Sequence, residues 1–359
     1  MTEGRAIETL SLSFTMGVIA GSILPGTGPW LPSALLVALF LPFLFYRPLV
    51  RLPRNWSRVF LALCFALLGV FCYWNSAQAG LSTGNFLETW ALEAAGRLRA
   101  FIGAIPFRFD GSAPLLRALL TGDRSGLSGE TVAVFRSSGA SHLLALSGLH
   151  IGIIYLLFDR LTWVMGRSPA ARRLRFALIL ACAGFFTLMT GAGPSIVRAF
   201  LFITINETLR LLERPRKAVR VLCLALLLQL VLSPEVIRST GFQLSYLAMA
   251  GIFLLYPVLE SWYPVSARWD PFRKIWNMAA LCISCQLFTA PLAWLRFHSF
   301  PRYFLLTNLL AIPVTSVLMG TALLTLLLQA LGCCPPLLIT ATDSLCRLLL
   351  WILEVIARM

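Results

Sequence analysis

Apolar stretches of about twenty residues follow one another along nearly the whole chain, and this pattern constrains the fold most strongly. A helix needs roughly 20 apolar residues to cross a hydrocarbon layer about 30 Å thick. We therefore predict about eleven membrane spans, near residues 9–25, 29–46, 57–74, 138–158, 174–192, 194–212, 218–234, 240–258, 275–295, 303–330 and 336–357. Of the 359 residues, 58% are hydrophobic and only 13% are charged. This composition predicts an all-α polytopic membrane protein without a soluble catalytic domain.

Basic residues predict how these spans are oriented, because short cytoplasmic loops collect Lys and Arg. More than half of the 30 Lys and Arg residues are Arg5 or lie in the stretches 47–58, 160–175, 210–220 and 268–274. All of these lie on one side if the N-terminus is cytoplasmic, and the C-terminus is then extracytoplasmic. The net charge of +15 is therefore interpreted mainly as a topology signal.

The longest stretch between predicted spans, residues 75–137, is predicted to lie outside the cytoplasm. From Phe86 onward, apolar residues recur at helical spacing between charged ones. This pattern predicts an amphipathic helix in the membrane interface, with a partner-binding helix as the alternative. Acidic and basic residues nearly cancel over 86–137, so we expect no electrostatic funnel for a polyanion here.

Four motifs occur in order through the rest of the chain. The first comprises residues 119–128, Leu-Leu-Thr-Gly-Asp-Arg-Ser-Gly-Leu-Ser, and residues 135–152, Phe-Arg-Ser-Ser-Gly-Ala-Ser-His-Leu-Leu-Ala-Leu-Ser-Gly-Leu-His-Ile-Gly. The others lie at 191–199, 233–245 and 308–313. Together they resemble the ComEC family, competence proteins that form the inner-membrane channel for single-stranded DNA in natural transformation.

The resemblance covers about residues 112–359, for which it implies a competence-type membrane channel domain. This domain would follow an N-terminal three-helix membrane region at 1–74 and an extracytoplasmic linker with the amphipathic helix at 75–111. The resemblance implies a multi-pass protein of the bacterial inner membrane, with single-stranded DNA and membrane lipid as partners. A separate ATPase motor, DNA-receptor proteins and further copies of the chain are additional partners that the sequence leaves open.

The sequence departs from full-length ComEC proteins in two respects. Members of that family have an OB-like domain after the first helices, and the short stretch between 74 and 86 cannot hold a five-stranded barrel. They also have a C-terminal metallo-β-lactamase-like domain, which we do not expect here, because the sequence ends at Met359 and holds only three histidines. We therefore expect no metal, no cofactor and no enzymatic activity. Since no phosphate-binding Gly-Lys loop occurs, a separate ATPase or an ion gradient would drive transport.

Polar residues within the predicted spans are candidates for lining a translocation path, because polar groups inside a bilayer are costly and usually face protein or water. The candidates are His142, Ser147, His150, Arg198, Gln243, Ser245 and Asn308. In one continuous helix over 138–158, Ser147 and His150 would share a face. The alternatives are contacts between packed helices and a Ser/His hydrolase site, for which no acidic neighbour is present in sequence.

Charged residues inside the later spans have two interpretations. Arg198 either reaches back to the outer interface or binds a phosphate or carboxylate. Glu207 is predicted to pair with Arg210 or Arg214 at helical spacing. In the last span, Asp343 and Arg347 are predicted to neutralise each other.

Overall fold

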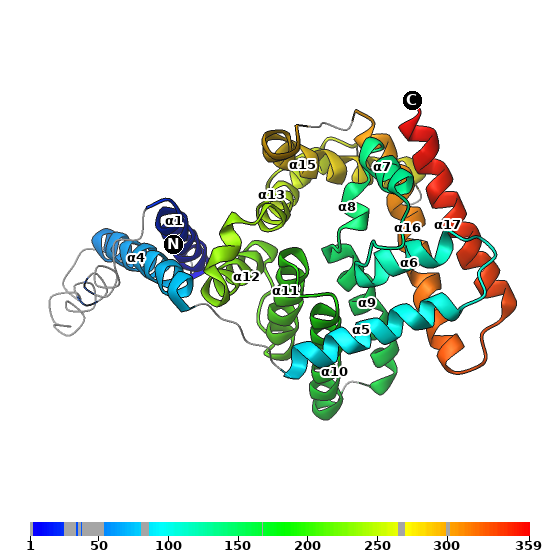
Figure 1. The fold of residues 1–359 in the computed structure, drawn as a ribbon. Coiled ribbons are helices and arrows are strands. Elements are labelled where there is room, and N and C mark those ends of the chain that lie inside the picture. The colour runs from blue at the N-terminus through cyan, green and yellow to red at the C-terminus, as the bar shows by residue number, and fades with distance from the viewer. Residues whose placement is uncertain are drawn as a thin grey trace. The chain divides into compact units, whose positions relative to one another are not determined.

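The structure is a computed structural model that describes residues 3–24, 34, 37, 54–79, 86–166, 168–264, 270–298 and 302–359. Over these residues the fold is entirely helical, which confirms the predicted class (Figure 1). The helices are α1 (Glu3–Ile23), α4 (Arg54–Ala79), α5 (Phe86–Ala104), α6 (Ser112–Thr121), α7 (Gly129–Ser137), α8 (Ser141–Leu144), α9 (Gly148–Leu161), η1 (Thr162–Met165), α10 (Pro169–Met189), α11 (Pro194–Leu211), α12 (Ala218–Leu232), η2 (Pro234–Arg238), α13 (Thr240–Leu254), α14 (Tyr256–Ser261), α15 (Pro271–Phe297), α16 (Phe304–Ala330) and α17 (Pro336–Ala357).

Seven segments of the described chain are long and apolar enough to cross a membrane. They are Ala6–Ile23, Trp56–Ser76, Gly148–Met165, Thr240–Ser261, Phe272–Phe297, Phe304–Ala330 and Pro336–Ala357. Large apolar side chains are exposed on these helices, including Val317, Leu327 and Trp351. Lipid is the environment in which such surfaces are stable, so the chain is a membrane protein.

The other four predicted spans have different outcomes. The span at 29–46 lies outside the described residues apart from positions 34 and 37. Those at 174–192, 194–212 and 218–234 correspond to α10, α11 and α12. Arginines occupy the first turns of α10 and shorten its apolar run, charged residues interrupt the run in α11, and α12 has only 15 residues. A count of eleven spans is therefore not confirmed.

The prediction of one continuous span over 138–158 is wrong. Helix α7 ends at Ser137, and Gly139 then has a φ of 82°, a left-handed value that glycine adopts without strain. After the single turn of α8, the backbone is extended at Ala145 and at Ser147. A new helix, α9, begins only at Gly148. We call residues 138–147 the broken segment.

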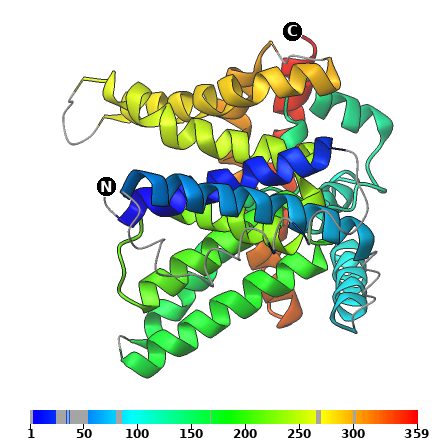
Figure 2. The ribbon, with the colours of Figure 1, turned by 90° about the vertical axis from the view of Figure 1, so that its left-hand side faces the viewer.

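By internal packing, the chain divides into two units, which we describe separately. Unit 1 comprises residues 1–84 and 200–243, and in it α1 and α4 lie side by side (Figures 1 and 2). Glycines allow this approach: a Cβ built on Gly17 would lie 1.7 Å from the carbonyl oxygen of Ala66. The indole Nε1 of Trp74 also donates a hydrogen bond to the carbonyl of Gly21, at 3.0 Å.

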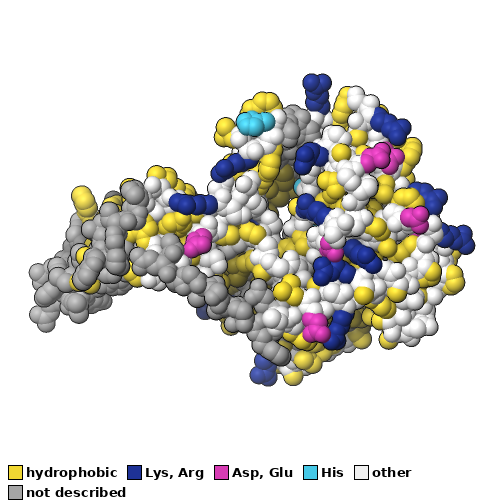
Figure 3. All heavy atoms as spheres, viewed as in Figure 1, with side chains coloured by type: hydrophobic (Ala, Val, Ile, Leu, Met, Phe, Trp, Pro, Cys, Tyr) yellow, Lys and Arg dark blue, Asp and Glu magenta, His cyan; other side chains and the backbone are white. Residues whose placement is uncertain are grey.

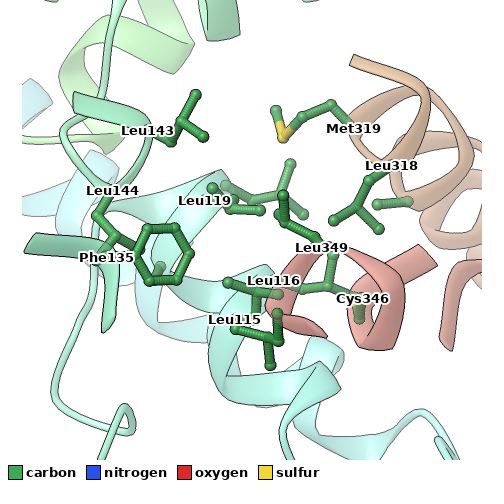
Figure 4. Close-up of a cluster of buried hydrophobic side chains, with 14 of the residues drawn as sticks. Leu115, Leu116, Leu119, Phe135, Leu143, Leu144, Leu318, Met319, Cys346 and Leu349 are labelled. Carbon is green, nitrogen blue, oxygen red and sulfur yellow. The ribbon is translucent and has the colours of Figure 1, made fainter. Parts of the chain in front are cut away.

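Unit 2 comprises residues 85–199 and 244–359, and its core is a cluster of buried apolar side chains. Helices α6, α7, α16 and α17 meet the broken segment there (Figure 4). Leu143 and Leu144 of α8 extend into this cluster together with Phe135 of α7. The broken segment is therefore anchored in the core, although its backbone is not a continuous helix. Helix α5, the predicted amphipathic helix, contacts α6 and α10.

Candidate functional site

The first motif forms the connection between α6 and α7, immediately before the broken segment. Gly122 ends α6 with a φ of 77°, and a Cβ at this position would lie 2.5 Å from Cδ1 of Leu146. The Asp123 carboxylate accepts hydrogen bonds from the backbone N–H and the hydroxyl of Ser125, at 3.0 and 2.7 Å. These bonds are the main reason that the pKa of Asp123 is lowered, and a 3.3 Å ion pair with Arg99 adds to the effect. The positive φ at position 122 therefore favours glycine, and the Asp123 carboxylate stabilises the turn that follows.

Arg124, the next residue of this motif, fastens the connection to the broken segment. Its Nε and one terminal nitrogen both donate to the carbonyl oxygen of Leu144, at 3.2 and 2.9 Å. This oxygen lies at the end of α8, where a helix leaves its last carbonyls without intrahelical donors. Ser128 then caps α7 by accepting a hydrogen bond from the N–H of Thr131. The motif is thus a structural clamp, a role that the sequence analysis did not assign.

Helix α16 also holds the broken segment. The hydroxyl of Thr307, which is completely buried, donates to the carbonyl of Ser138 at 2.7 Å. His142 lies further along, with Nδ1 at 3.2 Å from the carbonyl of Gly139. His142 itself is exposed.

Ser147 and His150 interact in the structure, but as a helix cap and not as a strip along a helix face. The Ser147 hydroxyl accepts a hydrogen bond from the N–H of Leu149 and lies 3.0 Å from Nδ1 of His150. The same Nδ1 lies 3.2 Å from the Ser147 backbone N–H, which donates to it. Since Nδ1 accepts, the ring proton is on Nε2. This nitrogen is buried without a hydrogen-bond partner among the described residues.

Arg198 lies one turn into α11, and only 8% of its surface is exposed. Its Nε donates to the hydroxyl of Ser245 at 2.6 Å, and its guanidinium lies over the ring of Tyr246 at 5.9 Å from the centroid. Ser245 and Tyr246 belong to α13, so Arg198 joins the parts of α11 and α13 that lie in unit 2. The predicted site residues Arg198 and Ser245 are therefore in direct contact.

The two remaining candidates have different surroundings. Gln243 belongs to unit 1, and its side-chain amide donates to the carbonyl of Ile237 in η2 at 2.7 Å. It therefore joins neighbouring turns of its own segment. Asn308 follows Thr307 in α16, and its Oδ1 is buried with no partner among the described residues.

Both ion pairs predicted within helices are present. Glu207, which is buried, pairs with Arg210 at 3.4 Å. Asp343 lies 3.9 Å from Arg347, but it accepts closer hydrogen bonds from the hydroxyl of Ser112 at 2.7 Å and from a backbone N–H at 3.1 Å. This link between α17 and α6 could not be seen in the sequence, because the partners are more than 200 residues apart.

The surface of unit 2 carries charges of both signs. On the face drawn in Figure 3, basic side chains lie beside acidic ones, with apolar side chains between them. On α5, Arg97 and Glu93 form a well exposed ion pair with a distance of 2.9 Å. Among the described residues, no group of three or more His, Cys, Asp or Glu side chains is placed to hold a metal ion.

Comparison with known families places these features in context. The family model described as "Competence protein" matches residues 119–359, about two thirds of the chain. The chain belongs to the competence protein family. The match includes the clamp, the broken segment, Arg198 and every later helix of unit 2. The resemblance inferred from the motifs is thereby confirmed.

Three relatives illustrate the breadth of this family. "ComE operon protein 3" of Bacillus subtilis is 26% identical over 202 residues, covering 56% of this chain and 24% of that protein. "Recombination protein 2" of Haemophilus influenzae is 28% identical over 222 residues, covering 57% and 27%. "Competence protein ComA" of Neisseria gonorrhoeae is 35% identical over 95 residues, covering 25% and 14%. The chain thus spans about a quarter of the length of these relatives, or less, and no solved structure matches it significantly.

Proposed function

We propose that this chain is a component of an inner-membrane channel that takes single-stranded DNA into the bacterial cytoplasm during natural transformation. Membership of the competence protein family over residues 119–359 is the observation that carries this proposal. In this arrangement the N-terminus and the basic loops face the cytoplasm, as the distribution of Lys and Arg favours.

Buried polar groups in unit 2 support a transport role. In a membrane, a polar group without a partner is costly, so packing alone does not favour one. Yet the described residues leave Nε2 of His150 and Oδ1 of Asn308 without hydrogen bonds, and Arg198 is buried beside neutral side chains. A path for a polar solute would supply these groups with water or substrate. The break between α8 and α9 is consistent with this role, since irregular backbone at membrane depth occurs where protein or water covers it.

The driving force and the chemistry belong to other components in this proposal. The chain contains no phosphate-binding Gly-Lys loop, so a separate ATPase or an ion gradient moves the strand. We also propose that the chain does not cut DNA. Purified protein incubated with labelled single- or double-stranded DNA, with and without Mg²⁺ or Zn²⁺, should leave both intact. Cleavage that disappears in His142→Ala or His150→Ala would contradict this point.

A transformation assay tests the channel itself. A deletion strain of the host bacterium is complemented with the wild-type gene, Arg198→Gln, His150→Ala or the control Arg97→Gln, which removes an exposed charge. Fluorescent DNA is then followed into the cytoplasm, and the amount of protein in the membrane is measured by immunoblot. We expect normal amounts of all variants in the membrane. DNA uptake should be lost only in Arg198→Gln and His150→Ala. If the deletion strain takes up DNA as well as the wild type, the chain transports another solute or is a scaffold.

A further inference from the structure

The guanidinium of Arg198 lies beside the first turn of α9, a position that is electrostatically unfavourable for a cation. Its Nη2 lies 3.4 Å from where a Cβ of Gly148 would be. Gly148 is the first residue of α9, a helix of 14 residues. The N-terminus of a helix carries a partial positive charge, so a second positive charge there raises the potential further.

No acidic side chain compensates this charge among the described residues. The contacts of Arg198 are with the hydroxyl of Ser245 and the ring of Tyr246, both uncharged. With 92% of the surface of the residue covered, Arg198 has also lost most of its hydration. A buried cation is normally paired, because desolvation of an unpaired charge is expensive. An anion is therefore the missing partner.

The backbone at this position adds a donor for such an anion. The N–H of Gly148, like those of every first helical turn, has no partner within its helix, and within the described residues no other acceptor reaches it. Glycine at position 148 places no side chain next to the guanidinium, and a Cβ there would lie 3.4 Å from both Nη2 of Arg198 and Cβ of Ala199. Helix N-termini beside an arginine are typical binding sites for phosphate groups.

We propose that Gly148, Arg198 and Ser245 form a binding site for a single phosphate group, with Tyr246 supporting the guanidinium from one side. The planar guanidinium donates two parallel hydrogen bonds to the phosphate oxygens. The N–H of Gly148 donates a third hydrogen bond to one of the same oxygens. If the proposed function is correct, the ligand is one phosphodiester of the transported strand. The headgroup of an anionic lipid offers the same chemistry and is distinguished experimentally.

Two matched measurements on the purified full-length chain test this site. The first measures the thermal stability of the wild type with inorganic phosphate and with chloride at equal ionic strength. The second measures binding of fluorescein-labelled oligothymidylate by anisotropy at several salt concentrations, in nanodiscs of neutral phosphatidylcholine. Arg198→Gln removes the charge, and Arg198→Lys keeps it without the planar fork. Gly148→Ala keeps the arginine but places a methyl group 3.4 Å from it.

We expect phosphate to stabilise the wild type and not Arg198→Gln. The same substitution should weaken oligonucleotide binding by about tenfold or more, as for loss of a charge-assisted hydrogen bond. It should reduce the dependence of log affinity on log salt by about 0.7, the value for one phosphate of a single strand. Arg198→Lys and Gly148→Ala should show intermediate losses, and Arg97→Gln should behave as the wild type. Arg198→Lys and Gly148→Ala are milder substitutions, so they still test the site if Arg198→Gln does not fold.

The outcomes separate this site from the proposed function. If phosphate stabilises only proteins with Arg198 intact but no variant binds oligonucleotide, the phosphate site stands and the DNA channel fails. Stronger stabilisation by nanodiscs that contain phosphatidylglycerol, again dependent on Arg198, would then identify a lipid headgroup as the ligand. If the wild type and the Arg198 variants bind oligonucleotide equally and respond equally to phosphate, the site is refuted and the channel proposal is unaffected. Absence of any phosphate effect on the wild type also refutes the site.

Discussion

Two buried threonines of α16 allow a direct test of how the broken segment is held. Thr307 and Thr315 are both completely buried and occur in the same helix, two turns apart. Thr307 donates to the carbonyl of Ser138, whereas the hydroxyl of Thr315 has no hydrogen-bond partner among the described residues. Valine has nearly the shape of threonine and lacks the hydroxyl, so the same substitution should have opposite effects at the two sites.

The expected magnitudes follow from what each hydroxyl does. Thr307→Val leaves the Ser138 carbonyl without its side-chain donor, and an unsatisfied buried acceptor costs about 1–3 kcal/mol. Thr315→Val removes a hydroxyl that is desolvated without compensation, so the free energy of unfolding should stay the same or rise by up to about 1 kcal/mol. The two variants should therefore differ by about 1–4 kcal/mol.

Equilibrium denaturation of the purified protein in detergent micelles measures these free energies. Hydrogen exchange adds the location, because Thr307→Val should raise exchange selectively over residues 138–147, and Thr315→Val should leave that region unchanged. Equal stabilities, or equal exchange over 138–147 in both variants, would refute the role of the Thr307 hydrogen bond in holding the broken segment.

Three further predictions concern packing, acid stability and topology. Gly17→Ala should destabilise the protein by about 1–3 kcal/mol, because the added methyl group meets a backbone carbonyl of α4. The control Gly320→Ala has open space around its Cβ and should not destabilise the protein. Equal denaturation curves for the two variants would contradict this prediction. The pKa of Asp123 is lower in the folded protein than in the unfolded chain. The stability that Asp123 contributes is therefore present above the unfolded pKa and is lost as pH falls through the folded pKa. Asp123→Asn should reduce the loss of thermal stability between pH 5 and 3 by less than about 1 kcal/mol. In spheroplasts, cysteine at Arg97 should react with an impermeant maleimide and cysteine at Arg173 should not; the reverse pattern would invert the topology.

The helical class could be predicted from the sequence because it depends on a property averaged over twenty residues. Apolar stretches of that length form helices in a membrane whatever their partners, since the backbone must satisfy its own hydrogen bonds there. The break between α7 and α9 was missed for the same reason. Averaged over 138–158, the apolar residues of α8 and α9 conceal the pairs Ser138-Gly139 and Ser147-Gly148. The signals were nevertheless local: Gly139 as a helix terminator, and Ser147 with His150 as a cap.

The contacts of the candidate site could not be predicted in this way. Arg198 donates a hydrogen bond to Ser245, which lies 47 residues away in sequence. Arg124 donates to the carbonyl of Leu144, which lies 20 residues away. Such pairs depend on how helices cross, which neither periodicity nor hydropathy specifies. What the sequence did identify is that polar residues inside spans need a partner.

The motif residues fall into two groups that differ in how their polar capacity is used. Asp123, Arg124 and Gln243 make hydrogen bonds to the protein itself, so substituting them should change the fold before it changes transport. His150 and Arg198 retain capacity, the first as an unpaired Nε2 and the second as a positive charge without an acidic neighbour among the described side chains. Such groups carry a free-energy cost in a membrane, and a bound ligand of the kind proposed above would offset it. A transported polyanion would be such a ligand, and it would account for both groups at once.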